Sequence, residues 1–278
     1  MTRLLAVDIG NSTVSVGLFE DDRLQKRVDL PALPILSEEQ IAAHLAKELG
    51  TLGLALSNVE GVALSSVIPE AGDRWQSFVG RYLQLTPLVV TGRTPTPLRL
   101  RYEDPDDLGP DRLVNAVAAF DRFGGPVIIA SVGTATVVDA VSEKGEYLGG
   151  TIQPGPGLAL EALAAGAARL PRLELEPPPR LIGANTRESM LAGVVFGTVG
   201  AVEMIADLMA TQFGADCPLV VTGGWASLLL PYLETKYEHL PDLTLTGLQL
   251  VWAFSQAPTP ASATPKRPRP SRRAGDAR

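Results

Sequence analysis

The stretch Leu4-Leu5-Ala6-Val7-Asp8-Ile9-Gly10-Asn11-Ser12-Thr13 decides the fold, because it joins an apolar run to a tight polar turn. The run from Leu4 to Ile9 predicts a buried strand, and the alternation from Thr13 to Phe19 predicts a strand that returns beside it. Glycine and asparagine between two such runs are typical of a hairpin. The chain therefore opens with a β-hairpin that carries polar groups at its tip.

A second copy of this pattern lies in the other half of the chain. Val127 to Ala130 predicts a buried strand, Ser131-Val132-Gly133-Thr134-Ala135-Thr136 a second glycine turn, and Val137 to Val141 a returning strand. One mixed α/β unit in each half predicts two similar lobes that face a cleft.

The rest of the chain alternates short apolar runs with amphipathic segments, as α/β proteins do. In the first half we predict strands at Arg23 to Asp29, Val62 to Val67 and Leu88 to Val90, and helices at Ser37 to Leu49 and Glu70 to Leu85. In the second half we predict strands at Tyr147 to Gln153 and Leu219 to Val221, helices at Asp111 to Phe123, Leu158 to Ala168 and Thr186 to Phe213, and a closing segment at Leu248 to Phe254.

Composition narrows the class of protein. The single cysteine, Cys217, excludes an internal disulfide, and its place beside an apolar strand favours a structural role in a reducing cytosol. Two scattered histidines do not predict a zinc site. Leu4 to Val7 is too short for a secretory signal, and we expect no membrane-spanning run. We therefore expect a cytoplasmic protein.

The C-terminal segment differs in composition from the rest. Residues 255–278 hold six basic residues, one acid and several prolines, while the net charge of the whole chain is −7. The body is thus strongly acidic, which argues against nucleic acid as a ligand. We predict an N-terminal lobe at 1–110, a C-terminal lobe at 111–254 and a disordered basic, proline-rich tail at 255–278. A basic arm for acidic partners is the alternative interpretation of the tail.

The glycine turns carry groups that suit phosphate. Glycine lets backbone N–H groups approach a phosphate closely, and Asp8 at the strand end can hold a Mg²⁺ that bridges phosphate oxygens. No lysine follows Gly10, so this is not a Walker loop. A plain hairpin is the alternative for either turn alone. Val220-Val221-Thr222-Gly223-Gly224-Trp225-Ala226 follows another strand, and its glycines can pack under an adenine or simply form a turn.

The stretch Leu108-Gly109-Pro110-Asp111-Arg112 provides chemistry for an acceptor substrate. Asp111, at a predicted helix start, is either a base or a capping residue, and Arg112 is either a fork for a carboxylate or a surface residue. Tyr102 either lines the acceptor pocket or only packs. Thr186 is either a ligand or a helix cap.

Taken together and in order, these motifs resemble the type III pantothenate kinases of the actin-like, hexokinase-like superfamily. The resemblance spans residues 3 to 254. Its segments are Asp8 to Asn11, Ser65 to Pro69, Tyr102 to Asn115, Gly133 to Thr136, Tyr147 to Gly150, Pro154-Gly155, Leu170-Pro171, Thr186 to Ser189, Thr222 to Gly224 and Leu243 to Leu248.

The resemblance implies two actin-like, ribonuclease H-like lobes around a nucleotide cleft, and ATP-dependent phosphorylation of pantothenate to 4'-phosphopantothenate, the first step of coenzyme A synthesis. It also implies a homodimer that uses Mg²⁺ and a monovalent cation, K⁺ or NH₄⁺. Asp111 corresponds to the general base. The ATP-binding positions are Asp8, Ile9, Gly10, Asn11, Ser12, Thr13, Val14, Ser15 and Thr134, and the pantothenate-binding positions are Tyr102, Gly109, Pro110, Asp111, Arg112 and Thr186.

Two residues depart from the family pattern. Ser131 stands where the family has an aspartate that helps hold the monovalent cation, and Ser12 stands where the family has threonine. A hydroxyl is a weaker ligand for a cation than a carboxylate. We therefore expect either a kinase that runs without K⁺ or one that needs more of it, and we favour the first, because Asp8, Asp139 and the ATP phosphates supply other anions.

Two other functions remain open from the sequence. A kinase of the same superfamily for another small hydroxy compound would need a different acceptor pocket. A non-catalytic, regulatory nucleotide-binding protein of the same fold draws its support only from Ser131 and the tail.

Overall fold

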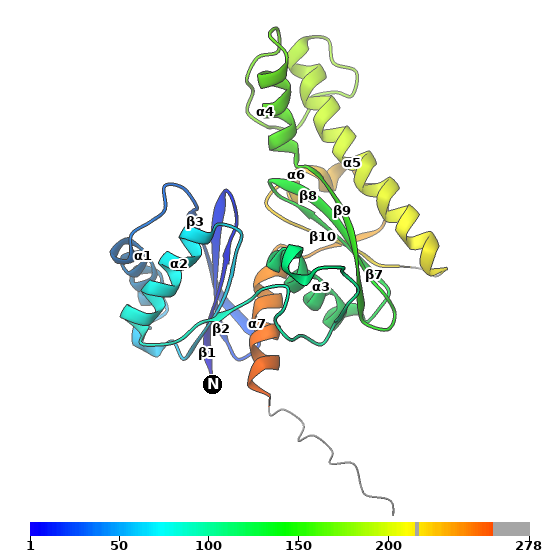
Figure 1. The fold of residues 1–278 in the computed structure, drawn as a ribbon. Helices are drawn as coiled ribbons and strands as arrows, with labels where there is room; N and C mark the ends of the chain where they lie inside the picture. The colour runs from blue at the N-terminus through cyan, green and yellow to red at the C-terminus, as the bar shows by residue number, and fades with distance from the viewer. Residues whose placement is uncertain (215–216, 258–278) are drawn as a thin grey trace, which may run out of the picture.

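The computed structural model describes residues 1–214 and 217–257, which form two lobes side by side (Figure 1). The first lobe is built on a five-stranded sheet in the order β3-β2-β1-β4-β5. Its strands are β1 (Arg3–Ile9), β2 (Thr13–Glu20), β3 (Arg23–Pro31), β4 (Gly61–Ser66) and β5 (Leu88–Val89). β1, β2 and β3 are antiparallel neighbours, and β4 and β5 continue the sheet in parallel.

The second lobe repeats this order in a six-stranded sheet, β11-β10-β7-β8-β9-β6. Its strands are β6 (Arg99–Leu100), β7 (Val127–Val132), β8 (Ala135–Val141), β9 (Glu146–Pro154), β10 (Leu219–Thr222) and β11 (Tyr237–His239). β7, β8 and β9 are antiparallel, and β10 and β11 lie parallel to β7. The predicted pair of similar α/β lobes is confirmed.

The duplication extends to single hydrogen bonds at the turns. In the first lobe the residue after β3 donates back to the turn, from the Ala32 N–H to the Ser12 carbonyl at 3.2 Å. In the second lobe the residue after β9 does the same, from the Gly155 N–H to the Thr134 carbonyl at 2.9 Å. The third strand of each lobe therefore holds that lobe's glycine turn in place.

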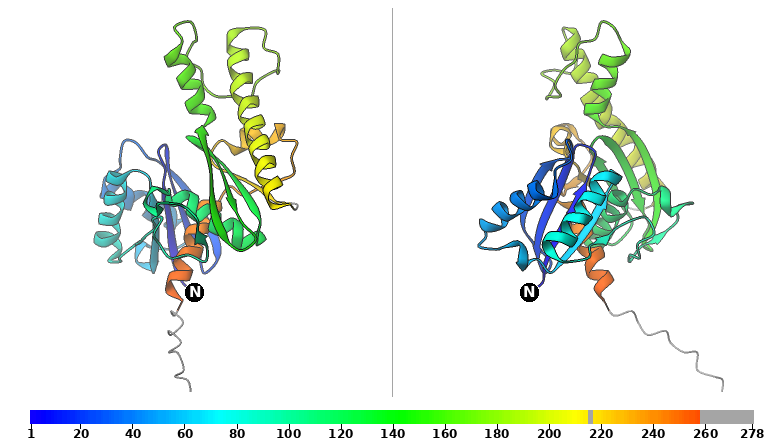
Figure 2. Two further views of the ribbon diagram at one scale, coloured as in Figure 1. Left: turned by 45° about the vertical axis from the view of Figure 1, so that its right-hand side comes forward. Right: turned by 60° about the vertical axis from the view of Figure 1, so that its left-hand side comes forward.

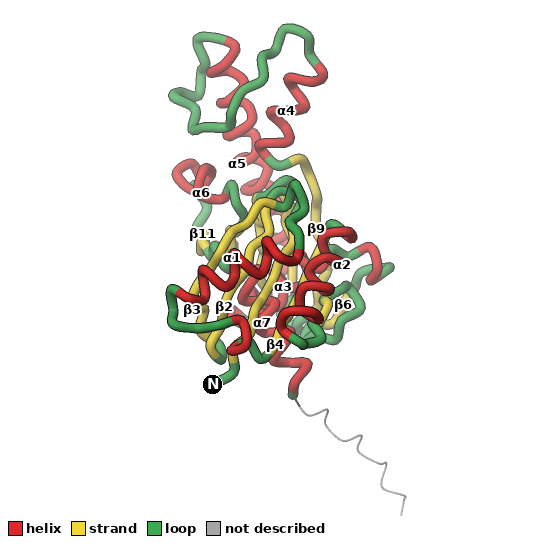
Figure 3. The backbone as a smooth tube through the Cα atoms, turned by 90° about the vertical axis from the view of Figure 1, so that its left-hand side faces the viewer, coloured by secondary structure: helices red, strands yellow, loops and turns green. Residues whose placement is uncertain are grey.

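Helices cover both faces of the first sheet. Figure 3 shows α1 (Glu38–Gly50) and α2 (Pro69–Phe78) in front of it. On the other face, α3 (Pro110–Phe123) and α7 (Leu243–Gln256) pack against each other between the lobes. One apolar core joins β1, α3, α7 and β7 through Leu4, Leu113, Leu248 and Ile129. The two lobes thus share a core rather than meeting only at their surfaces.

An arm projects from the second lobe. It consists of α4 (Pro156–Gly166), a long connection and the beginning of α5 (Thr186–Phe213), and Figure 2 shows it standing clear of both sheets. The short helix α6 (Ala226–Leu229) lies near its base. Single turns complete the described chain: Leu56–Asn58, Pro105–Asp107 and Leu230–Tyr232 are 3-10 helices, and Val79–Leu83 is a π-helical continuation of α2.

Several predicted elements and bounds differ from the structure. The closing segment is a helix that begins at Leu243 rather than at Leu248. Thr244 and Gly247 do not interrupt it, because Leu243, Leu245 and Leu248 beside them are buried in the core. β6 and β11 were not predicted, since two or three residues carry no periodic signal. Finally, Arg99–Leu100 already pairs with β9, so the chain changes sheet before the predicted boundary at 110. The predicted tail, apart from its first three residues, lies outside the described residues.

One helix of the described chain, α5, bears on the expectation of no membrane-spanning run. This helix is long and apolar enough by length and composition to cross a membrane, with a mean hydropathy of 1.7 over its most apolar window. Half of that window is buried inside the protein, where Val195, Val199 and Val202 pack on the second sheet. A core helix of a soluble protein passes the same test, and the exposed half of α5 needs another explanation.

Candidate active site between the lobes

Asp8 faces the shared core because of strand alternation. Leu5, Val7 and Ile9 point to the face covered by α1 and α2, while Leu4 and Ala6 point toward α3 and α7. Asp8, near the end of β1, follows Leu4 and Ala6 in the alternation and therefore points to the same face, toward α3 and α7. Its neighbour on β4, Ser65, donates a hydrogen bond from Oγ to Asp8 Oδ1 at 2.7 Å.

Burial makes this carboxylate difficult to ionise. Desolvation raises the pKa of Asp8 to about 7, against a lowering effect of the Ser65 hydrogen bond. The negative charge of Asp111 raises the pKa of Asp8 further, and Arg27 lowers it. Two carboxylates from different lobes therefore face one site, which is a favourable place for a cation.

The beginning of α3 shapes the position of Asp111. Gly109 is the N-cap residue and Pro110 occupies the first turn, so Asp111 is not the N-cap itself. A Cβ on Gly109 would lie 2.6 Å from Asp111 Oδ1, so glycine is required for the carboxylate to fold back over the helix start. Burial raises the pKa of Asp111, while the backbone N–H and the guanidinium of Arg112 lower it.

Arg112 forms a buried ion pair. Its Nη2 donates to Asp139 Oδ1 at 2.6 Å and its Nε to Asp139 Oδ2 at 3.2 Å, so the fork holds a carboxylate of the protein itself. Its Nη1 donates to the Tyr102 hydroxyl at 3.3 Å. The guanidinium also lies over the rings of Tyr102 and Tyr147, at 5.6 and 6.0 Å. One proton on Nη1 and one on Nη2 remain for a ligand.

The two glycine turns meet. Ser12 Oγ and Thr134 Oγ1 lie 3.2 Å apart, although they belong to different lobes. Each turn is closed by one backbone bond, Gly10 N–H to the Thr13 carbonyl at 3.0 Å and Gly133 N–H to the Ala135 carbonyl at 2.9 Å. The tip residues of both turns are exposed, and they are Asn11, Ser12, Thr13 and Thr134.

Three of the predicted ATP-binding residues have fewer groups available to bind ATP than the others. Ile9 and Val14 point into the core under α1 and α2, so they can contribute only backbone groups. The Ser15 hydroxyl donates to Asp29 at 2.7 Å and accepts from Arg27. Its proton is therefore already bonded within the first lobe.

The second turn offers little negative charge for a monovalent cation. Ser131 is half-buried on β7. Asp139, which we counted as a free anion nearby, is balanced by Arg112. Within residues 1–214 and 217–257 no group of three or more His, Cys, Asp or Glu side chains lies together as a metal site would. A Mg²⁺ held by Asp8 would thus take its other ligands from phosphates and water, as this ion commonly does.

The glycine pair after β10 packs behind the second turn. Gly223 has φ +98°, and a Cβ there would lie 2.4 Å from the Val132 carbonyl oxygen. Two residues further on, the Trp225 N–H donates to that same oxygen at 2.9 Å. The Trp225 side chain is 39% exposed. The turn thus presents an aromatic surface next to the exposed tip of the second turn.

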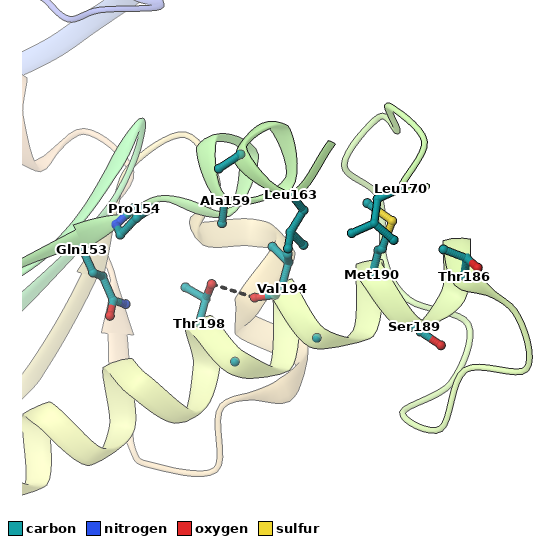
Figure 4. A pocket seen from close by; sticks show the side chains of 13 residues that line it. Gln153, Pro154, Ala159, Leu163, Leu170, Thr186, Ser189, Met190, Val194 and Thr198 are labelled. Carbon is teal, nitrogen blue, oxygen red and sulfur yellow. Dashed lines mark hydrogen bonds between the residues drawn. The ribbon is translucent and has the colours of Figure 1, made fainter. Parts of the chain in front are cut away.

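Thr186 lies away from these residues. It begins α5 at the outer end of the arm, whereas α3 lies between the lobes (Figure 1). The N-cap of α5 is Asn185, which accepts from the Glu188 N–H, so Thr186 is not the cap. With Ser189 and Met190 it lines a largely apolar cavity of about 880 Å³ between α4 and α5 (Figure 4).

Several residues of the site were not predicted as such. Ser65 and Tyr147 belong to segments of the resemblance, but the sequence assigns them no role, and it indicates Asp139 only as a nearby anion. A usable signal does exist, since Asp139 is the only charged residue in the apolar strand β8. A charge in such a place needs a partner.

The chain is similar to known proteins over most of its length. A family model described as type III pantothenate kinase matches residues 4–208. The type III pantothenate kinase of Roseiflexus sp. (strain RS-1) is 38% identical over 256 residues, 91% of this chain and 100% of that protein. That of Moorella thermoacetica is 40% identical over 249 residues, 90% of this chain and 98% of that protein.

Solved structures support the fold. Component A of (R)-2-hydroxyglutaryl-CoA dehydratase from Acidaminococcus fermentans has a TM-score of 0.55 at 10% identity, covering 92% of this chain and 98% of its own. The ethanolamine utilization protein EutJ from Carboxydothermus hydrogenoformans has a TM-score of 0.52 at 14% identity, covering 90% of each chain. At such low identity these matches concern the fold alone, which is of the two-lobed, actin-like class.

Proposed function

Because the chain belongs to the type III pantothenate kinase family, it transfers a phosphoryl group from ATP to pantothenate in coenzyme A synthesis, and we propose the residue roles that follow. The observation that carries these roles is the meeting of the two lobes. Turns from both lobes touch through Ser12 and Thr134, and the charge of Asp111 in one lobe raises the pKa of Asp8 in the other.

Asp111 is the general base. Its raised pKa reflects a poorly solvated carboxylate, which accepts a proton more readily than an exposed one. The acceptor hydroxyl of pantothenate would give its proton to this group as the phosphoryl arrives. Phosphoryl transfer depends mostly on positioning and charge stabilisation, so the base contributes only part of the rate.

The glycine turns hold the ATP phosphates between them. Backbone N–H groups at each tip and the hydroxyls of Ser12, Thr13 and Thr134 are exposed and uncharged, so they can donate to phosphate oxygens without the cost of a buried cation. Asp8 fits Mg²⁺ as a hard oxygen ligand. When bound, the ion neutralises phosphate charge. Ser131 and the paired Asp139 fit K⁺ or NH₄⁺ poorly.

Tyr102 and Arg112 bind the carboxylate of pantothenate. The Tyr102 hydroxyl accepts from Arg112 Nη1, which leaves its own proton free to donate. Arg112 keeps a further Nη1 proton. Two adjacent donors of this kind suit one carboxylate.

The working unit is a homodimer. The part of α5 that does not pack on the second sheet exposes Met204 and Leu208, and the arm exposes Leu158, Leu163, Leu181 and Ile182. These residues, with the cavity that Thr186 lines, fit an apolar surface on a second copy of the chain. A partner would also account for Thr186, because the partner's arm can bring this residue to a pantothenate site that its own chain places out of reach.

The proposal is tested by following ATP-dependent formation of 4'-phosphopantothenate by the purified protein. Turnover with pantothenate but not with sugars separates this function from that of a kinase for another hydroxy compound. ATP binding without turnover on any acceptor would instead support the regulatory alternative. Burial raises the pKa of the single thiol, Cys217, to about 11, which fits a structural rather than a reactive residue.

A further inference from the structure

Asp139 is buried in a place that explains the geometry of Arg112. The residue is 4% exposed in the middle of β8. Its Oδ1 accepts from Arg112 Nη2 at 2.6 Å and from the Tyr147 hydroxyl at 2.9 Å, and its Oδ2 accepts from Arg112 Nε at 3.2 Å. Opposite Asp139 stands Gly150, where a Cβ would lie 2.5 Å from Oδ1. The absence of a side chain at this position of β9 thus leaves room for the Asp139 carboxylate.

These contacts leave the guanidinium little freedom. Asp139 occupies the Nε–Nη2 edge and the Tyr102 hydroxyl accepts from Nη1, while the central carbon lies 5.6 and 6.0 Å from the ring centroids of Tyr102 and Tyr147. The side chain of Arg112 is 7% exposed and that of Asp139 is 6% exposed, so neither is free to turn into solvent. The protons that remain for a ligand are the second Nη1 proton, beside the Tyr102 hydroxyl, and the Nη2 proton that does not face Asp139.

The pair also limits how Arg112 can attract an anion. Because Asp139 balances its charge, the pair is electrically neutral as a unit. Attraction for a carboxylate then comes from the placement of the donors on Nη1 and Tyr102 rather than from net charge. Selectivity for an acidic substrate therefore depends on the group that fixes the guanidinium.

We propose that Asp139 is a positioning residue that, with Tyr147, sets the selectivity of the acceptor site for a carboxylate. Asp139 does not touch the substrate. This inference rests on the proposed function, because it takes the carboxylate of pantothenate as the ligand of Arg112 and Tyr102.

The test compares pantothenate with pantothenol, in which a hydroxymethyl group replaces the carboxylate. In Asp139→Asn an amide N–H would face an arginine donor, so the guanidinium must turn. We expect the KM for pantothenate to rise about tenfold or more, the size expected for a lost hydrogen bond to a charged group. We expect kcat for pantothenate, and both constants for pantothenol, to stay near those of the natural chain.

Two further variants keep the test decisive. Tyr147→Phe removes only the hydroxyl, so it preserves the buried ion pair, and we expect it to raise the KM for pantothenate about threefold. Gln249→Leu removes a buried polar group elsewhere, whose amide bonds the Asp21 carbonyl, and we expect it to leave the ratio of the two KM values unchanged. If Asp139→Asn does not fold, Tyr147→Phe decides the question.

Some outcomes overturn the proposal. If Asp139→Asn raises the KM for pantothenate and for pantothenol equally, Asp139 has only a structural role. If it leaves the KM for pantothenate unchanged or lowers it, net charge governs binding at the site. If the natural chain phosphorylates neither compound, the proposed function fails. Calorimetric binding of the two compounds to the natural chain and to Tyr147→Phe then tests Asp139 separately.

Discussion

At the scale of single residues, the proposed chemistry rests on Asp111 as the general base. We expect Asp111→Asn to reduce kcat about 10²–10⁴-fold, the usual contribution of a general base, while pantothenate and ATP still bind. The amide has nearly the same shape but cannot accept the proton. Rapid-quench turnover and calorimetric binding check both parts. Near-normal turnover in this variant would exclude Asp111 as the base.

Asp8 makes the stability of the ligand-free protein dependent on pH. Its pKa is raised in the folded protein to about 7, from 3.8, so the folded state binds a proton that the unfolded state has lost between these values. Stability must therefore fall as pH rises from 4 to 7. One pKa unit corresponds to about 1.4 kcal/mol, so the full effect is about 4 kcal/mol above pH 7.

Asp8→Asn should remove the loss of stability that comes from ionising this buried carboxylate. We expect its melting temperature to exceed that of the natural chain by several degrees at pH 8, with the difference shrinking to nothing near pH 4. We also expect the variant to lose MgATP-dependent turnover. Differential scanning calorimetry across this pH range provides the check. A variant that is equally destabilised at both ends of the range would contradict the assignment.

We propose that Ser131 determines whether the kinase needs a monovalent cation. A hydroxyl adds no negative charge, and Asp139 is balanced by Arg112, so we expect turnover to be the same in Na⁺, K⁺ and cation-depleted buffer. This is the outcome that we expected from the sequence, but Asp139 no longer supports it as a free anion. Ser131→Asp should introduce activation by K⁺. Strong K⁺ activation of the natural chain that Ser131→Asp leaves unchanged would refute this account.

At the scale of elements, the beginning of α3 positions Asp111, the proposed base. Gly109 has φ −55°, which alanine adopts without strain, yet a Cβ there would lie 2.6 Å from Asp111 Oδ1. We expect Gly109→Ala to lower kcat more than tenfold with little change in melting temperature, because the displaced carboxylate sits badly for proton transfer. Gly124→Ala, at the other end of α3, is a useful contrast. Its φ of +68° predicts a loss of stability rather than of kcat.

The sequence predicted what is local in these elements. Apolar runs and glycine turns place Asp8 and Gly133 at strand ends, and Pro110 places Asp111 in a first turn. The partner of Arg112 could not be predicted, since Asp139 meets it only when α3 packs on the second sheet. The role of Ser65 is likewise hidden, because it depends on the register of β4 beside β1.

At the scale of the whole molecule, the duplicated lobes followed from the repeated pattern, whereas the arm did not. Nothing in the periodicity of α4 and α5 indicates that they project from the body. The family resemblance therefore assigns Thr186 to the acceptor site, whereas the structure places it at the outer end of the arm. A second copy that brings its arm to the first copy's site reconciles the two.

This arrangement predicts complementation between two impaired chains. Asp111→Asn should be nearly inactive, and Thr186→Ala should raise the KM for pantothenate about tenfold through a lost hydrogen bond. If Thr186 acts on the partner's site, a mixed dimer contains one site with both natural residues. After co-refolding in equal amounts, random pairing gives about one natural site in four. Assayed at low pantothenate, the mixture should exceed the mean of the two separate variants. Activity equal to that mean, with mixed dimers demonstrated by native mass spectrometry, would show that each chain uses its own Thr186 or none.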